Sequence, residues 1–112
     1  MAGTIKRTVG PIALSATMTT NVYNNTSALI YDVIRHIHVA NKTGGAVSFS
    51  LWLGATGTNA AGTELFNAQN VPANSSFDWY GALKMTSTDF LVGGASAGTS
   101  LTITAEGEQL VV

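Results

Sequence analysis

Cysteine is absent from this chain of 112 residues, which excludes a disulfide framework, thiolate metal sites and cysteine nucleophiles together. Charge is also scarce: Asp, Glu, Lys and Arg make up 10% of the residues and the net charge is -1, whereas about a quarter of an ordinary soluble domain is charged. The polar residues are mainly Ser, Thr, Asn and Gly. Such a surface suits a protein that packs against other proteins, because few charges have to be desolvated there.

Basic clusters and long hydrophobic runs are also missing. The five cationic residues are scattered along the chain, whereas nucleic-acid binding usually needs a basic stripe that displaces counterions. The longest apolar runs are a handful of residues, and spanning a bilayer takes about 20. We therefore expect neither a nucleic acid nor a membrane as a partner.

What the sequence does contain is a period of two. Apolar residues alternate with small polar ones between clusters of Gly, Asn, Ser and Thr, and this period is that of β-strands. The length fits one domain. The sequence predicts an all-β fold, an antiparallel two-sheet β-sandwich of jelly-roll or Ig-like type with seven to eight strands. The expected strands cover residues 11–23, 28–41, 46–53, 63–68, 75–84, 90–92 and 101–106.

The first ten residues lie outside this alternation and end before Pro11. We interpret residues 1–10 as an N-terminal arm and residues 11–112 as a single β-sandwich domain. The apolar tail at residues 109–112 would be unusual in free solvent, so we expect it to pair with a sheet edge or a neighbouring chain.

The long strand at residues 28–41 does not divide cleanly into an apolar and a polar face. Strict alternation places Asp32, His36 and His38 on one face and puts Arg35 among apolar residues on the other. Zinc and copper sites use two histidines at this spacing, but a third ligand would have to come from elsewhere in the chain, with Asp32 on the same face as one possibility. We predict no metal site and interpret the histidines as a pair facing solvent or a protein partner.

Motifs for catalysis are not convincing either. The Gly-x-Ser-x-Gly spacing occurs once, at residues 94–98, but we interpret the glycine-rich segment 93–98 as a bulge and a turn, because the helix that follows a nucleophile elbow is not predicted here. The glycine-rich stretches also lack the Lys and the following helix of a phosphate cradle. Glu106 and Glu108 stand near the end of the chain, where solvated charge explains them better than glycoside hydrolysis does. We expect no enzyme activity, no catalytic residues and no cofactor.

Four aromatic residues can be assigned to a face of their strand. Trp52 stands on the polar side of the strand at 46–53, so either a loop or the arm covers it, or a partner contacts it. In the strand at 75–84 we assign Phe77 and Trp79 to the core and Asp78 and Tyr80 to solvent or a partner.

A family resemblance rests on segments 34–41 (IRHIHVAN), 50–55 (SLWLGA), 78–81 (DWYG) and 101–107 (LTITAEG). These strands and turns resemble those of small tailed-bacteriophage virion proteins over residues 30–107. The resemblance implies a β-sandwich on or in the phage particle, with the capsid decoration or minor capsid role nearest. Such proteins form oligomers at symmetry axes of the shell and reinforce contacts between capsid subunits.

We therefore expect a structural virion protein, made in the host cytoplasm and located on the capsid surface. Its partners would be the major capsid protein or other virion proteins and further copies of itself, with a trimer favoured. The alternatives are a head-tail connector or tail component, or a carbohydrate-binding module that uses Trp52 and Tyr80 as platforms. We assign protein contacts to six residues, of which the first two would anchor the arm on an acidic capsid surface: Lys6, Arg7, His36, His38, Trp52 and Tyr80.

Overall fold

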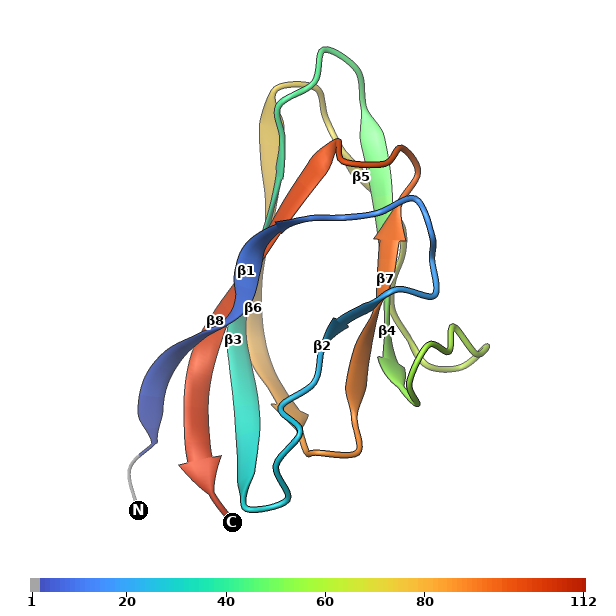
Figure 1. Ribbon diagram of the computed structural model, residues 1–112. Coiled ribbons are helices and arrows are strands. Elements are labelled where there is room, and N and C mark those ends of the chain that lie inside the picture. The colour runs from blue at the N-terminus through green and yellow to red at the C-terminus, as the bar shows by residue number, and fades with distance from the viewer. Residues whose placement is uncertain (1–2) are drawn as a thin grey trace.

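Eight antiparallel strands in two sheets make up the computed structural model, which describes residues 3–112 (Figure 1). One four-stranded sheet has the order β1-β8-β3-β6 and the other has the order β2-β7-β4-β5. The strands are β1 (Thr4–Ala13), β2 (Asn21–Tyr23), β3 (Ile30–Asn41), β4 (Val47–Gly54), β5 (Glu64–Val71), β6 (Ser75–Met85), β7 (Phe90–Ala95) and β8 (Leu101–Val111). The predicted all-β sandwich is confirmed.

The strand order distinguishes between the two predicted architectures. The chain crosses from one sheet to the other after every strand except β4, which is followed by its sheet neighbour β5. Eight strands with this order form a jelly roll. Of the described residues, no helix is long and apolar enough to cross a membrane.

The core fills the space between the sheets. At its centre, the buried ring of Phe49 on β4 packs against Phe66 on β5 and Phe77 on β6, with ring centroids 5.5 and 5.6 Å away. Tilted rings at these separations pack favourably. Phe77 and Trp79 are partly buried against the core, as the alternation of β6 predicts. The two sheets are therefore joined by aromatic packing.

The N-terminal segment belongs to the sandwich. β1 pairs with β8 from Thr4 opposite Gln109 to Ala13 opposite Thr102, so the predicted arm is wrong for residues 4–10. Residues 1 and 2 lie outside the described part of the chain. The pairing register shifts twice within β1, and such bulges change the face that a side chain occupies. The alternation that would have revealed this strand is therefore broken.

The C-terminal tail is also paired. Residues 109–111 continue β8 and pair with residues 30–32 of β3. β8 therefore lies between β1 and β3, and its last two residues pair with β3. Of the two pairings expected for the tail, with a sheet of its own chain or with a neighbouring chain, the structure shows the first.

A bulge at Arg35 resolves the mixed faces of β3. Ile34 pairs with Gly107 and His36 with Glu106, so Arg35 has no opposite residue on β8. The bulge therefore changes which residues point into the core, from even-numbered positions before it to odd-numbered positions after it. The prediction that Asp32 shares a face with the histidines is wrong: buried residues precede the bulge at positions 32 and 34 and follow it at 37 and 39.

Gly107 is required at this bulge. A Cβ atom at residue 107 would lie 1.9 Å from the carbonyl oxygen of Val33 and 2.9 Å from the amide nitrogen of Arg35. No side chain fits at such distances without backbone movement. The glycine thus allows β8 to approach β3 where the face of β3 changes.

Candidate functional site

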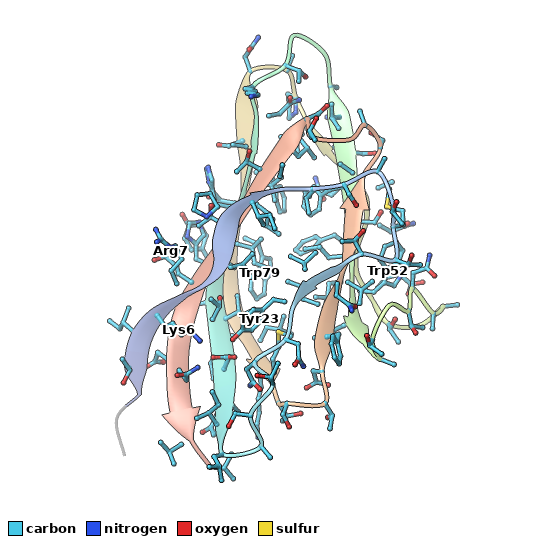
Figure 2. All side chains as sticks on the ribbon, in the orientation of Figure 1. Lys6, Arg7, Tyr23, Trp52 and Trp79 are labelled. Carbon is cyan, nitrogen blue, oxygen red and sulfur yellow. The ribbon has the colours of Figure 1, made fainter. Side chains whose placement is uncertain are left out.

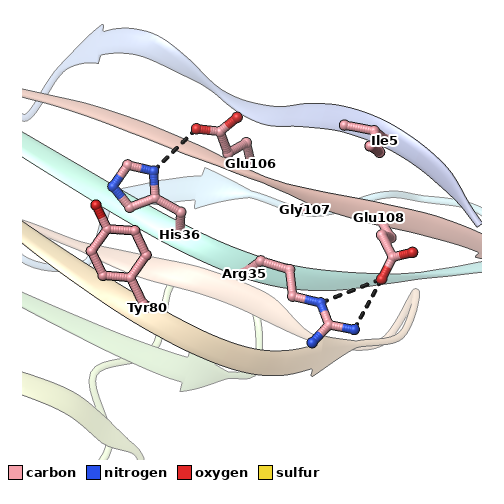
Figure 3. Close-up of a pocket in the computed structure, with 7 residues that line it drawn as sticks. All are labelled: Ile5, Arg35, His36, Tyr80, Glu106, Gly107 and Glu108. Carbon is pink, nitrogen blue, oxygen red and sulfur yellow. Dashed lines mark hydrogen bonds and ion pairs between the residues drawn. The ribbon is translucent and has the colours of Figure 1, made fainter.

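A hollow lies on the outer face of the β1-β8-β3-β6 sheet. This shallow groove, of about 440 Å³, runs across four neighbouring strands (Figure 3). We call this surface the open face. Its groove is lined by Ile5, Arg35, His36, Tyr80, Glu106, Gly107 and Glu108.

The two histidines share one carboxylate at this face. Asp78 on β6 places its Oδ1 2.7 Å from His36 Nε2 and 2.7 Å from His38 Nδ1. Strand pairing accounts for the arrangement, because His38 pairs directly with Asp78, and His36 is the next residue on the same side of β3. One atom from each residue thus converges on a single point.

His36 is fixed from two further sides. Its Nδ1 lies 3.0 Å from Glu106 Oε1 on β8, as Figure 3 shows. The ring of Tyr80 stacks on the imidazole with the centroids 4.5 Å apart and the planes 2° from parallel. The imidazole orientation is therefore held by three residues from two neighbouring strands.

These contacts shift the pKa of two groups. The pKa of His36 is raised above its ordinary value by the hydrogen bond to Glu106 and then by that to Asp78. The pKa of Asp78 is lowered, first by the hydrogen bond to His38 and then by that to His36. Both shifts favour an imidazolium beside a carboxylate.

Arg35 and Glu108 form the other end of the groove. The guanidinium donates to Glu108 Oε2 from Nε at 3.3 Å and from Nη2 at 3.0 Å. This pair is largely exposed to solvent, so it contributes little to stability. Glu106 and Glu108, which we interpreted as solvated charges, do reach solvent, but they lie on the interior strand β8, where Glu106 contacts His36.

Lys6 and Arg7 do not form a basic pair. Lys6 lies with its Nζ 3.5 Å from the hydroxyl of Tyr23 and 5.8 Å from the centre of that ring. Arg7 is exposed on the neighbouring position of β1 (Figure 2). Because neighbouring residues of a strand point to opposite faces, the two side chains do not lie together on one surface.

Behind Lys6, a buried carboxylate links the sheets. Asp32 is 0% exposed; its Oδ2 accepts a 2.6 Å hydrogen bond from the Tyr23 hydroxyl and its Oδ1 a 3.3 Å bond from Gln109. Burial, and then Asp32, raise the pKa of Tyr23. Asp32 is therefore a structural residue inside the sandwich, not part of the histidine cluster.

Trp52 is buried under a loop and therefore lacks the exposed surface that the predicted contact with a partner requires. Trp52 and Asn21 both pair with Val92, which places the three side chains on the outer face of the other sheet. Asn21 binds the loop that follows β4, through Thr56 Oγ1 at 2.9 Å and the amide of Gly57 at 2.7 Å. With this loop across the face, Trp52 is only 8% exposed, as one of the two predicted alternatives requires.

Sequence analysis identified four residues of the open face as contact residues, but it did not predict that His36 and His38 form a cluster with Asp78. His36, His38 and Tyr80 lie there together, and Arg7 pairs with Glu106 in the strand register. Asp78 was assigned to solvent or a partner without a link to the histidines. The shared register of β3, β6 and β8 provides that link, and no local motif encodes it.

No family model matches the chain, and no curated protein matches it either. The resemblance to tailed-phage virion proteins therefore stays a prediction.

Proposed function

We propose that this chain is a structural virion protein, of capsid decoration or minor capsid type, that docks through its open face. The proposal rests on one observation above all: the exposed large hydrophobic side chains belong to the β1-β8-β3-β6 sheet or to residues directly flanking its strands. Of the described residues, these are Ile5, Ile12, Leu29, Tyr80, Val111 and Val112.

The chemistry of this face supports protein contact. Tyr80 is 72% exposed and Ile5 is 84% exposed, and both line the groove together with Arg35. Tyr and Arg are enriched at protein interfaces, where an aromatic anchor and an arginine fork contribute much of the binding energy.

The architecture supports the class of protein by analogy. Jelly rolls occur in viral capsid proteins, and also in lectins and cupins. A fold alone does not establish function, so the architecture adds to the argument from the open face and does not replace it. The partner in this proposal is the major capsid protein or another virion protein, and the protein is a homo-oligomer, with a trimer favoured, on the capsid surface.

Co-sedimentation with empty capsids tests the docking surface. We expect Tyr80→Ala to weaken binding by about tenfold or more, as loss of an interface anchor does. Asn67→Ala, an exposed position on β5 of the other sheet, is the matched control and should bind normally. Undiminished binding by the double variant Ile5→Ser, Tyr80→Ala would exclude the open face as the docking surface.

Copy number in purified particles separates the roles within a virion. A decoration or minor capsid protein is present in hundreds of copies, whereas a head-tail connector or tail component is present in few. Quantitative mass spectrometry against the major capsid protein measures this ratio. A low ratio would transfer the proposal to the connector or tail.

A carbohydrate-binding module is the second candidate, because an exposed aromatic ring stands beside polar groups in a groove. Tyr80 offers a stacking surface, and Glu106 and Arg35 offer an acceptor and donors nearby. Sugar binding on a glycan array that is lost in Tyr80→Ala would favour this candidate. Silence on the array would remove it.

A further inference from the structure

We propose that His36, His38 and Asp78 bind a divalent transition-metal ion of the zinc class. Each residue offers one ligand atom, and these atoms lie within 4.8 Å of one another. Asp32, the possible third ligand that the sequence suggested for the pair at positions 36 and 38, is buried on the other face of β3. The register of β3 with β6 supplies that ligand as Asp78.

The donor set fits zinc. Two imidazole nitrogens and one carboxylate oxygen suit Zn²⁺, whereas Mg²⁺ and Ca²⁺ prefer oxygen ligands throughout. Bonds of about 2.1 Å place tetrahedral ligands about 3.4 Å apart. The observed separations of 2.7 Å between the carboxylate oxygen and each nitrogen, and at most 4.8 Å within the set, bracket this spacing.

Glu106 provides the second, independent observation. Histidines that bind metals commonly donate the other ring N–H to a carboxylate, which fixes the tautomer and the ring orientation. His36 directs Nε2 toward the cluster while its Nδ1 lies 3.0 Å from Glu106 Oε1. Tyr80 stacks on the same ring. His36 is thus oriented as a ligand before any ion is bound.

The cluster is accessible to an ion from solvent. The side chains are 23% exposed for His36, 39% for His38 and 34% for Asp78. Three protein ligands leave a fourth tetrahedral position for water or for a side chain of another protein. Binding would displace the protons that the two nitrogens share with Asp78, and these protons would be released to the buffer.

This site goes beyond the proposed docking function and does not depend on it. The test therefore uses the isolated full chain, without an affinity tag that contains histidine. Failure to bind zinc would leave capsid binding untouched, and failure to bind capsids would leave the zinc site untouched.

Isothermal titration with ZnCl₂ measures the site directly. We expect one Zn²⁺ per chain, binding at least about tenfold weaker in His38→Gln and Asp78→Asn, because each loses a ligand. Glu106→Gln should weaken binding by about tenfold, the usual effect of removing an outer carboxylate. Glu108→Gln, on the same face but paired with Arg35, is the control and should bind like the unmodified chain.

Histidine NMR locates the ion without any substitution. The chain has two histidines, so each ring gives an assignable signal. Zn²⁺ should shift both sets of ring resonances to saturation at one equivalent, and Mg²⁺ should shift neither. Zinc binding with unchanged histidine signals, equal affinity in the ligand variants, or no binding at all would each overturn the proposal.

Discussion

The two sheets of this jelly roll share one core but differ in their outer faces, one of which is covered and the other exposed. The β2-β7-β4-β5 sheet buries Trp52 and Val92 on its outer side, under a loop held by Asn21. The β1-β8-β3-β6 sheet leaves its outer side open and presents Tyr80 and Ile5 to solvent. One face is therefore completed by the chain itself, and the other is available to a partner.

The difference shows that an aromatic residue on the outer side of a strand has no fixed meaning. Trp52 and Tyr80 both stand on the side of their strand that faces away from the core. A loop covers the first, while the second stacks on His36 and remains exposed. An outward side chain is buried only where a loop between strands covers it. Its burial then decides whether the residue contributes to stability or to binding.

The largest expected effect comes from removing the covered aromatic residue. Trp52→Ala should lower the free energy of unfolding by about 3 kcal/mol or more, because a buried ring leaves a cavity. Tyr80→Ala should cost less than about 1 kcal/mol, since its ring is mostly in water. Urea unfolding followed by circular dichroism measures both, and equal losses would abolish the distinction between the faces.

A smaller effect is expected where the open face is shaped by a close backbone approach. Gly107→Ala should destabilise the fold by about 1–3 kcal/mol, the range for forcing extra volume into packed structure. Gly45→Ala is the matched control, because a Cβ there meets nothing within 4 Å. If the two variants unfold at the same urea concentration, the bulge does not need its glycine.

The link between the sheets can be weakened by removing one oxygen atom. Tyr23→Phe deletes the hydroxyl that donates to buried Asp32 at 2.6 Å, and hydrogen bonds to charged groups contribute about 1.5–3 kcal/mol. We expect a loss of about 2 kcal/mol in urea unfolding. Tyr80→Phe, which keeps the exposed ring, should unfold like the unmodified protein; a matching loss there would contradict the assignment.

The smallest effect concerns pH and is confined to the open face. In metal-free protein His36 should titrate above its ordinary pKa of 6.5 in an NMR titration, because Glu106 and Asp78 favour the imidazolium. A raised folded-state pKa adds stability that is complete below the unfolded pKa and is lost as pH rises through the folded pKa. Glu106→Gln should move the midpoint back toward 6.5. A midpoint already at or below that value in the unmodified chain would contradict the hydrogen-bond network.

Regular alternation made much of the fold predictable from sequence. In β4 and β6 each second residue faces the core, so Phe49, Phe77 and Trp79 could be assigned correctly. Prediction failed where the alternation changes, within β1 and at Arg35, because one bulged residue reverses the face of all residues beyond it. The misplaced arm and the misplaced Asp32 have this same cause.

By itself the sequence determined the class of fold and the composition of its surface, because a period of two and a shortage of charge are local properties of the chain. Only the tertiary structure decided that Asp78 and Glu106 meet His36, across 42 and 70 residues of sequence, and that Trp52 is covered while Tyr80 is not. Strand register and loop placement bring these residues together, and both depend on pairings between segments that are distant in the sequence.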